Sequence, residues 1–224
     1  MKKLHLYGHK ASQADLQRHI EAIKSNVEKS PKYKYLQKYS RKFKKVRFLD
    51  IGCQMGEYIF HLSKEPNITY MKGIDIEKEY IDLGRKYFTN NIPNAELKVE
   101  SLFDIKNESY NMILMSEVIE HVDNPIKYIQ KIYDILEPGG YFIITTPSAL
   151  GITNILLNIK HWKNLNYIEK EKRGIGTETD HYYCWDKLTL FRLCNSAGFK
   201  YIDYNITNKF QPFKGQSLIL VVQK

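Results

Sequence analysis

Short runs of β-branched and apolar residues alternate with longer amphipathic stretches from residue 46 to the end of the chain. This alternation is typical of an α/β fold, in which helices connect the strands of a largely parallel sheet and cover both of its faces. The apolar runs predict seven strands, at residues 46–50, 69–75, 95–100, 110–115, 141–146, 199–206 and 216–222.

Two helices are marked by apolar stripes. In residues 124–136, Pro125 suits a first turn, and the sequence EPGG at 137–140 ends the helix. In residues 186–197, the helix stops at Gly198. Too few residues join the last two strands to hold a helix, so we expect these strands to pair antiparallel at one edge of the sheet.

Two segments lie outside this pattern. Residues 1–45 predict a basic helical arm or cap, and residues 147–179 predict a lid, because they are inserted after a strand at its carboxyl end. The arm has two apolar stripes at helical spacing, one made by Leu16, Ile20, Ile23 and Val27 and the other by Tyr35, Tyr39 and Phe43. We therefore expect residues 46–224 to form one domain that carries the lid.

The net charge of +9 belongs to the arm. Residues 1–45 hold 13 Lys/Arg against 3 Asp/Glu, whereas the remainder holds 21 against 22. A basic segment of this kind meets phosphate, an anionic lipid surface or an acidic substrate, and a simple solvated helix face is the competing interpretation. The burial of Tyr35, Tyr39 and Phe43 on the core would favour a cap.

The sequence has no feature of a secreted or membrane-spanning chain. No apolar run approaches the roughly 18 residues of a transmembrane segment, and the start MKKLHLYGHK lacks an apolar stretch behind its lysines. Cys53, Cys184 and Cys194 have neither an even count nor a metal-type spacing. A disulfide framework is therefore not expected, and the sequence predicts a cytoplasmic protein.

A glycine-containing turn, DIGCQMG at residues 50–56, directly follows the first strand of the sheet. Such a turn lets a nucleotide-type ligand approach the backbone at the start of a helix. The next strand ends at Asp75, 23 residues after Gly52. A carboxylate there can accept hydrogen bonds from both hydroxyls of a ribose, so the two motifs together predict an adenosine cofactor.

The charge around the turn selects the cofactor. Asp50 and Glu57 are acidic, and the glycines do not follow the G-x-G-x-x-G pattern with which backbone N–H groups face a pyrophosphate. A dinucleotide would therefore be repelled. S-adenosylmethionine carries an ammonium and a sulfonium and no phosphate, and it suits an acidic site.

Four motifs, in this order, resemble those of class I S-adenosylmethionine-dependent methyltransferases: FLDIGC (48–53), GIDI (73–76), SEVIEHV (116–122) and LEPGG (136–140). The resemblance implies a Rossmann-like, seven-stranded, mostly parallel sheet with an antiparallel hairpin at one edge, formed by a methyltransferase domain over residues 46–224. The implied cofactor-binding residues are Asp50, Gly52, Cys53 and Gly56 at the methionine end, Asp75 and Ile76 at the ribose and adenine, Ser101 and Leu102 at the adenine, and Ser116 at the sulfonium. One departure is Gln54, which replaces the middle glycine of D-x-G-x-G-x-G.

The reaction site is predicted after the fourth strand. In a helical turn, Glu117, Glu120 and His121 would share one face, and their oxygen-rich set would suit Mg²⁺ or Mn²⁺. His181, just before the last helix, is the fourth candidate metal ligand. Without a metal, His121 or His181 would act as the general base. A purely structural role for these residues stays open.

Two groups within this resemblance share E-x-x-E-H. Ubiquinone-type O-methyltransferases resemble the chain in SEVIEHVDNP (116–125) and LEPGGYFIITTP (136–147), and terminal 2′-O-methyltransferases of small RNAs resemble it in a histidine and tryptophan pair, here His181 and Trp185. The first hypothesis is O-methylation of a small molecule or lipid precursor. The alternatives are an RNA ribose bound through the basic arm, and a sugar or amine acceptor. Peripheral contact with a membrane, and a non-catalytic domain that binds the cofactor, also stay open.

Overall fold

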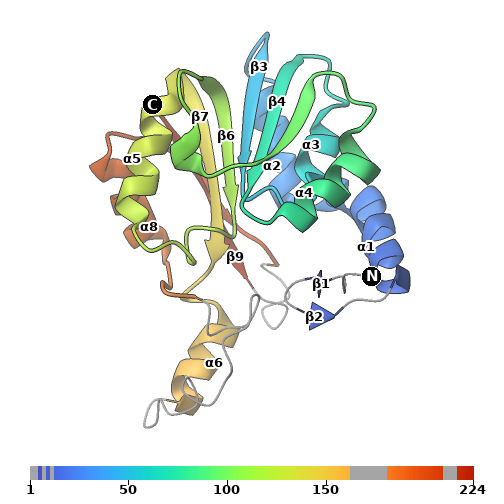
Figure 1. Cartoon of the computed structure of the whole chain (residues 1–224). Coiled ribbons are helices and arrows are strands. Elements are labelled where there is room, and N and C mark those ends of the chain that lie inside the picture. Colours follow the sequence, from blue (N-terminus) through green and yellow to red (C-terminus); the bar gives the residue numbers. More distant parts are fainter. Residues whose placement is uncertain (1–4, 7–8, 11–12, 162–180, 209–215) are drawn as a thin grey trace.

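Seven strands form one sheet in the order β5-β4-β3-β6-β7-β9-β8 (Figure 1). The structure, a computed structural model, describes residues 5–6, 9–10, 13–161, 181–208 and 216–224. The strands are β3 (Val46–Ile51), β4 (Ile68–Asp75), β5 (Ala95–Val99), β6 (Tyr110–Ser116), β7 (Leu136–Pro147), β8 (Lys200–Ile206) and β9 (Ser217–Gln223). β9 is antiparallel to both β7 and β8, and the pairs among β3 to β7 are parallel. The predicted sheet and its antiparallel edge are confirmed.

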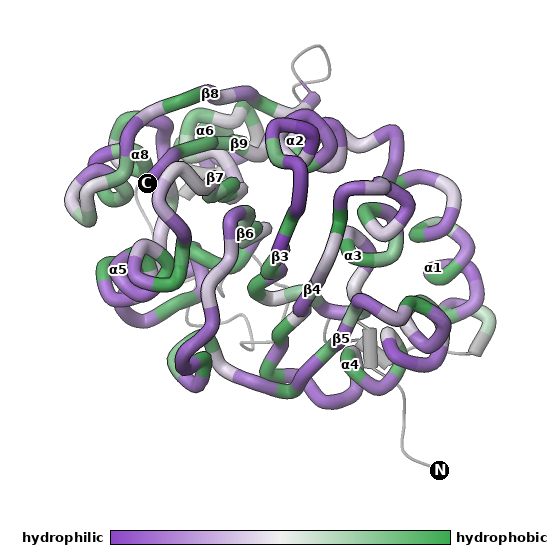
Figure 2. Tube along the Cα trace, turned by 90° about the horizontal axis from the view of Figure 1, so that it is seen from above, coloured by the Kyte–Doolittle hydropathy of each residue, from purple (hydrophilic) through white to green (hydrophobic). Residues whose placement is uncertain are grey.

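Helices cover both faces of the sheet (Figures 1 and 2). α5 (Pro125–Ile135) and α8 (Lys187–Ser196) lie on one face, where Ile129, Ile132 and Leu190 enter the core. The other face is covered by α2 (Pro31–Ser40), α3 (Glu57–Leu62) and α4 (Lys78–Gly84). The remaining elements are β1 (His5–Leu6), β2 (His9–Lys10), α1 (Gln13–Asn26), η1 (Val27–Lys29), η2 (Arg85–Thr89), η3 (Leu102–Asp104) and α6 (Ile152–His161).

The EPGG sequence at residues 137–140 lies within a strand. β7 begins at Leu136, five residues earlier than predicted, and its register with β6 shifts between the pairs Tyr110↔Leu136 and Met112↔Tyr141. Gly139 takes a positive φ of 77°, and its N–H donates to the carbonyl of Lys224 at 3.0 Å. The turn residues therefore form a bulge that keeps its backbone hydrogen bonds.

The N-terminal helices pack on the sheet. Tyr39 is buried, and its ring lies 4.9 Å from the ring of Tyr141 on β7. Tyr35 and Phe43 are half-buried against the same cluster, although Phe43 lies beyond the end of α2. This placement is the one expected of a cap rather than of a free arm. The division of the chain at residue 45 stays a prediction.

The predicted lid is described only in part, because residues 162–180 lie outside the described residues. Its first portion contains α6, which projects from the end of the sheet (Figure 1). At the base of the insertion, Ser148 forms a bridge with Trp185, and the N–H of Ala149 donates to the Trp185 carbonyl at 2.8 Å. Over the described ranges, no helix has both the length and the apolar character needed to cross a bilayer.

Candidate active site

A cleft of about 1230 Å³ opens at the carboxyl ends of β3, β4 and β6. The strand order reverses here, because β3 has β4 on one side and β6 on the other. In open α/β sheets, ligands bind where the order reverses. Eight of the nine predicted cofactor-binding residues line this cleft: Asp50, Gly52, Cys53, Asp75, Ile76, Ser101, Leu102 and Ser116.

Gly56, the ninth, does not line the cleft. It has a φ of 77° as the N-cap of α3, and a Cβ built on it would lie 3.0 Å from Leu97 Cδ2. The turn and the close packing against β5 therefore explain why residue 56 is a glycine. The structure assigns it no direct place beside a ligand.

The turn between β3 and α3 depends on left-handed backbone conformations. Gly52 has a φ of 72°, and a Cβ on it would lie only 2.4 Å from Val118 Cγ2. Gln54, where the family pattern has glycine, also takes a positive φ of 47°. The left-handed conformation costs a residue with a side chain about 1 kcal/mol, so the turn keeps its shape despite the substitution.

Replacing Gly52 with alanine tests this geometry. The methyl group meets Val118 and the positive φ becomes strained, so the free energy of unfolding should fall by roughly 2 kcal/mol or more. Chemical denaturation measures this value. The double variant Gly52→Ala/Val118→Ala removes the clash, so we expect alanine at residue 52 to cost less on the Val118→Ala background. If Gly52→Ala were as stable as the wild type, the left-handed backbone and the close packing described for Gly52 would be wrong.

Asp75 is fixed by backbone groups from two loops. Its Oδ2 accepts from the N–H of Gln54 at 2.9 Å, and its Oδ1 accepts from the N–H of Glu77 at 2.9 Å. Each carboxylate oxygen has a second lone pair, so both keep an acceptor site for a ligand. The carboxylate is therefore oriented in advance for a pair of hydroxyl donors.

Asp50 supplies a buried carboxyl at the base of the cleft. Only 1% of the residue is exposed, and its Oδ2 has no hydrogen-bond partner among the described residues. Burial raises the pKa of Asp50 well above its ordinary value, and the nearby charges of Glu57 and Asp75 raise it further. A cationic or N–H donor from a ligand would satisfy this oxygen and favour its charged form.

The turn after β6 differs from the prediction. Glu117, Glu120 and His121 do not share a helical face, because Glu117 has a positive φ of 54° and the segment forms a turn. The Glu117 carboxylate accepts from Lys32 Nζ and Thr145 Oγ1, both at 2.8 Å from Oε1. Glu117 therefore forms an ion pair with Lys32 and is not part of the candidate ligand cluster.

Glu120, His121 and His181 do come together. One ligand atom from each lies within 4.8 Å of the others, and the rings of the two histidines meet edge to face with their centroids 4.8 Å apart. The N–H of Tyr182 donates to the Glu120 carbonyl at 2.8 Å, which holds the segment after residue 180 against the turn. We call Glu120, His121 and His181 the EHH cluster.

Glu120 is the buried member of the EHH cluster. Burial, followed by the charge of Glu117, raises its pKa to about 7. Thr146 Oγ1 donates to its Oε2 at 2.9 Å. Its Oε1 lies 3.9 Å from His121 Nε2 and has no hydrogen-bond partner in the described part of the chain. This oxygen is the group that a cation or a protonated imidazole would satisfy.

The donor set of the EHH cluster bears on the predicted metal. Without Glu117, the cluster offers one carboxylate and two imidazoles, whereas the prediction was an oxygen-rich set. Imidazole nitrogen is a poor ligand for Mg²⁺ and a better one for transition metals. Of the two predicted ions, the cluster therefore fits Mn²⁺ better than Mg²⁺.

Sequence reasoning missed Lys32. It comes from the N-terminal segment, 85 residues before the glutamate that it contacts, and its side chain lines the cleft. Among the many lysines of residues 1–45, nothing in the spacing distinguishes it.

Comparisons with known proteins bear on the family and the fold of the chain. A family model described as "Methyltransferase domain" matches residues 14–204. The chain is 24% identical over 165 residues to the ubiquinone biosynthesis O-methyltransferase of Neisseria meningitidis serogroup C, a match that covers 70% of this chain and 65% of that protein. It is 30% identical over 113 residues to the mitochondrial ubiquinone biosynthesis O-methyltransferase of Dictyostelium discoideum, covering 45% and 35%. The chain thus spans less than two thirds of the length of either relative.

Solved structures share the fold. N-methyltransferase NodS from Bradyrhizobium japonicum, in complex with S-adenosyl-L-homocysteine, is 15% identical with a TM-score of 0.60, covering 92% of this chain and 97% of that one. An S-adenosylmethionine-dependent methyltransferase from Methanosarcina mazei is 19% identical with a TM-score of 0.65, covering 85% and 96%. At these identities the likeness shows the fold alone.

Proposed function

We propose that this chain, which belongs to the methyltransferase domain family and is an S-adenosylmethionine-dependent methyltransferase, transfers the methyl group to a hydroxyl of a small molecule or lipid precursor. The observation that carries the proposal is the EHH cluster beside the cleft, where a buried carboxyl and two imidazoles can activate a hydroxyl. The names of the curated relatives support O-methylation.

Different residues that line the cleft contact different parts of the cofactor. In the proposed arrangement, Asp75 accepts from the ribose hydroxyls, Asp50 faces the cationic amino-acid part, and Ile76, Ser101 and Leu102 border the adenine. When bound, S-adenosylmethionine supplies a methyl group on a positively charged sulfur, which makes the carbon electrophilic. The protein then has to place the acceptor oxygen in line and remove its proton.

The EHH cluster provides two candidate bases. His121 lines the cleft, and the ring of His181 lies against the ring of His121. Either imidazole can accept the hydroxyl proton as the new bond from oxygen to carbon forms and the bond from carbon to sulfur breaks. An ionised Glu120, 3.9 Å from His121, stabilises the imidazolium that results.

The same cluster fits a divalent cation. Glu120 Oε1, His121 and His181 would hold the ion, and the orphaned buried oxygen of Glu120 is the feature that favours it. Such an ion would supply Lewis-acid activation of two neighbouring hydroxyls, as in a catechol. The metal and the general-base versions share the EHH cluster and the same product class.

One experiment separates the acceptor classes. The protein is incubated with S-adenosylmethionine labelled on the methyl group and a cell extract, with and without chelator, and the extract is then divided into RNA, lipid and small soluble molecules. We expect label in the lipid or small soluble fraction, on oxygen by mass spectrometry. Loss of labelling with chelator supports the metal version, and unchanged labelling supports the general base. Label on RNA or on nitrogen would contradict the proposal.

The RNA alternative has two specific observations in its favour. Lys24, Lys29 and Lys34 of the N-terminal helices are exposed, and His181 lies at the EHH cluster. Other basic residues of this segment are already paired, Lys38 with Asp203 and Arg41 with Glu65. The small-molecule proposal is therefore preferred. Peripheral membrane contact and a cytoplasmic location stay predictions.

A further inference from the structure

A charged side chain is buried inside the sheet. Lys72 lies in the middle of β4, between Leu49 of β3 and Glu96 of β5, and only 1% of its side chain is exposed. A lysine in the interior of a sheet loses its hydration, and this loss is tolerated where carboxylates pair with the ammonium. The partners of Lys72 therefore indicate why a charge is kept at this position.

Two glutamates from one loop meet at Lys72. Its Nζ lies 2.8 Å from Glu100 Oε2 and 2.9 Å from Glu108 Oε1. The other carboxylate oxygen of Glu108 accepts from the hydroxyl of Tyr110. Burial lowers the pKa of Lys72, but the two glutamates outweigh this effect and raise the pKa above its ordinary value, so the ammonium stays charged. One buried charge thus joins the beginning of the loop to its end.

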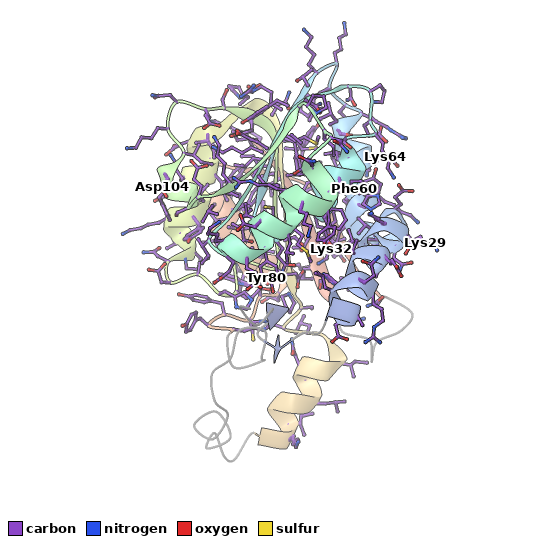
Figure 3. The ribbon with its side chains drawn as sticks, turned by 45° about the vertical axis from the view of Figure 1, so that its right-hand side comes forward. Lys29, Lys32, Phe60, Lys64, Tyr80 and Asp104 are labelled. Atoms are coloured by element: carbon purple, nitrogen blue, oxygen red, sulfur yellow. The ribbon has the colours of Figure 1, made fainter. Side chains whose placement is uncertain are left out.

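This loop borders the cleft. We call residues 100–109 the β5–β6 loop, because they connect these two strands and contain η3. In Figure 3, Asp104 of the loop lies on the side of the molecule opposite to Lys29, so the N-terminal helices do not cover the loop. Three of its residues line the cleft, namely Glu100, Ser101 and Leu102.

Other contacts of the β5–β6 loop hold its middle. The Asp104 carboxylate accepts from the N–H of Ser101 at 3.1 Å, which stabilises the first turn of η3. Lys131 Nζ on α5 donates to the carbonyl of Ile105 at 2.7 Å. Neither of these contacts joins the two ends of the loop. That connection is made by the ammonium of Lys72.

The connection depends on charge. Glu100 and Glu108 are mostly buried, with 18% and 28% of their side chains exposed. Without the ammonium between them, the two carboxylates are like charges in a site of low hydration, and they repel each other. The ends of the β5–β6 loop then separate, and the residues that follow Glu100 lose their fixed direction toward the cleft.

We propose that Lys72 is a positioning residue, which joins Glu100 to Glu108 and so holds the β5–β6 loop in the shape that receives the adenine of S-adenosylmethionine. A loop that is ordered in advance adds no ordering cost to binding, whereas a loop that is competent for part of the time weakens the apparent affinity by that fraction. The inference rests on the cofactor, with its adenine beside Ser101 and Leu102, and not on the acceptor.

The test measures binding and loop order in the same variants. Isothermal titration of Lys72→Met with S-adenosylhomocysteine should give an affinity roughly 10-fold or more below that of the wild type. Amide hydrogen exchange should be faster in residues 100–109 of the free variant, and the ligand should slow it there by more than in the wild type. Lys72→Arg keeps the charge and should regain much of the affinity. Lys98→Met, which removes a half-exposed lysine 3.1 Å from Glu96, is the charge-matched control and should bind like the wild type.

Further variants separate loop order from the stability of the fold. Lys72→Met leaves two unpaired carboxylates, so its free energy of unfolding should fall as well. Lys72→Met/Glu100→Gln/Glu108→Gln removes all three charges and should regain stability, because neutral groups often replace a buried ion cluster without loss. Its affinity should stay low, since nothing joins the ends of the loop. Glu100→Gln alone, whose amide oxygen can still accept from Lys72, should bind nearly as well as the wild type.

Three results would overturn the proposal. If Lys72→Met binds S-adenosylhomocysteine as the wild type does, or if the triple variant regains affinity together with stability, Lys72 only stabilises the fold. If Glu100→Gln alone shows the full loss, the affinity depends on the charge of Glu100 and not on Lys72. A wild-type protein that binds no S-adenosylhomocysteine would overturn the cofactor assignment, and this inference with it, before any variant is compared.

Discussion

Replacing Asp75 with alanine is expected to weaken S-adenosylmethionine binding by at least about 100-fold. The variant loses two charge-assisted hydrogen bonds to the ribose, each worth about 1.5–3 kcal/mol. It also leaves the N–H groups of Gln54 and Glu77 without the acceptor that fixes the two loops. Isothermal titration with S-adenosylmethionine and with S-adenosylhomocysteine measures the loss.

The matched control is Glu79→Ala, which removes an exposed carboxylate from α4 and should leave the affinity unchanged. Asp75→Asn should fall between alanine and the wild type, because an amide accepts through its oxygen alone. Wild-type affinity of Asp75→Ala would show that the ribose lies elsewhere. A titration in which NAD binds and S-adenosylmethionine does not would overturn the choice of cofactor.

Replacing Glu120 with glutamine is expected to lower kcat by about 100-fold or more while S-adenosylmethionine affinity changes less than about twofold. Glutamine fills the same volume and can still accept from Thr146, but it cannot become charged. Both the metal and the general-base versions need the charge. Steady-state kinetics with the acceptor found in the extract experiment measure kcat, and Asp134→Asn, at an exposed position of α5, serves as the control.

The raised pKa of Glu120 gives this prediction a pH dependence with a definite sign. The carboxyl is protonated below about pH 7, so wild-type activity should fall as the pH drops below that value. A fully active Glu120→Gln enzyme would make both versions of the mechanism wrong.

Stability should change in the opposite direction. The folded protein holds the Glu120 proton up to about pH 7, whereas the unfolded chain releases it near 4.5. The wild-type free energy of unfolding, relative to that of Glu120→Gln, should therefore fall as the pH rises from about 4.5 to about 7. The expected fall is on the order of 3 kcal/mol, and chemical denaturation at both pH values measures it.

The sequence was most informative about elements formed by local pattern. All seven strands of the sheet were predicted. The central strands are apolar runs because they are buried on both faces, whereas the edge strands β5 and β8 are only partly buried. The placement of eight predicted residues in one cleft follows from topology, since the carboxyl ends of parallel strands meet at one edge. Both results depend on rules that hold for the whole class of fold.

The predictions were wrong where the position of a single side chain or a single backbone angle determines the local structure. Glu117 was placed with Glu120 on a helical assumption, and its left-handed backbone instead directs it to Lys32. No rule of spacing predicts that angle for a glutamate. Lys32 was missed because its partner lies 85 residues away, and contacts at such separation follow only from the packed structure. The extra residues of β7 were read as a turn because a bulge and a turn use the same residue types.

The closed base of the insertion has a consequence for how this enzyme could diversify. The bridge from Ser148 to Trp185 and the bond from Tyr182 to the Glu120 carbonyl tie the chain on both sides of residues 150–180 to the sheet and to the turn after β6. A loop clamped at its stem transmits little of its own variation to the scaffold that carries it. Replacing residues 150–180 alone, with His181 and the rest of the EHH cluster left in place, would then change the insertion while the methyl-transfer site keeps its shape.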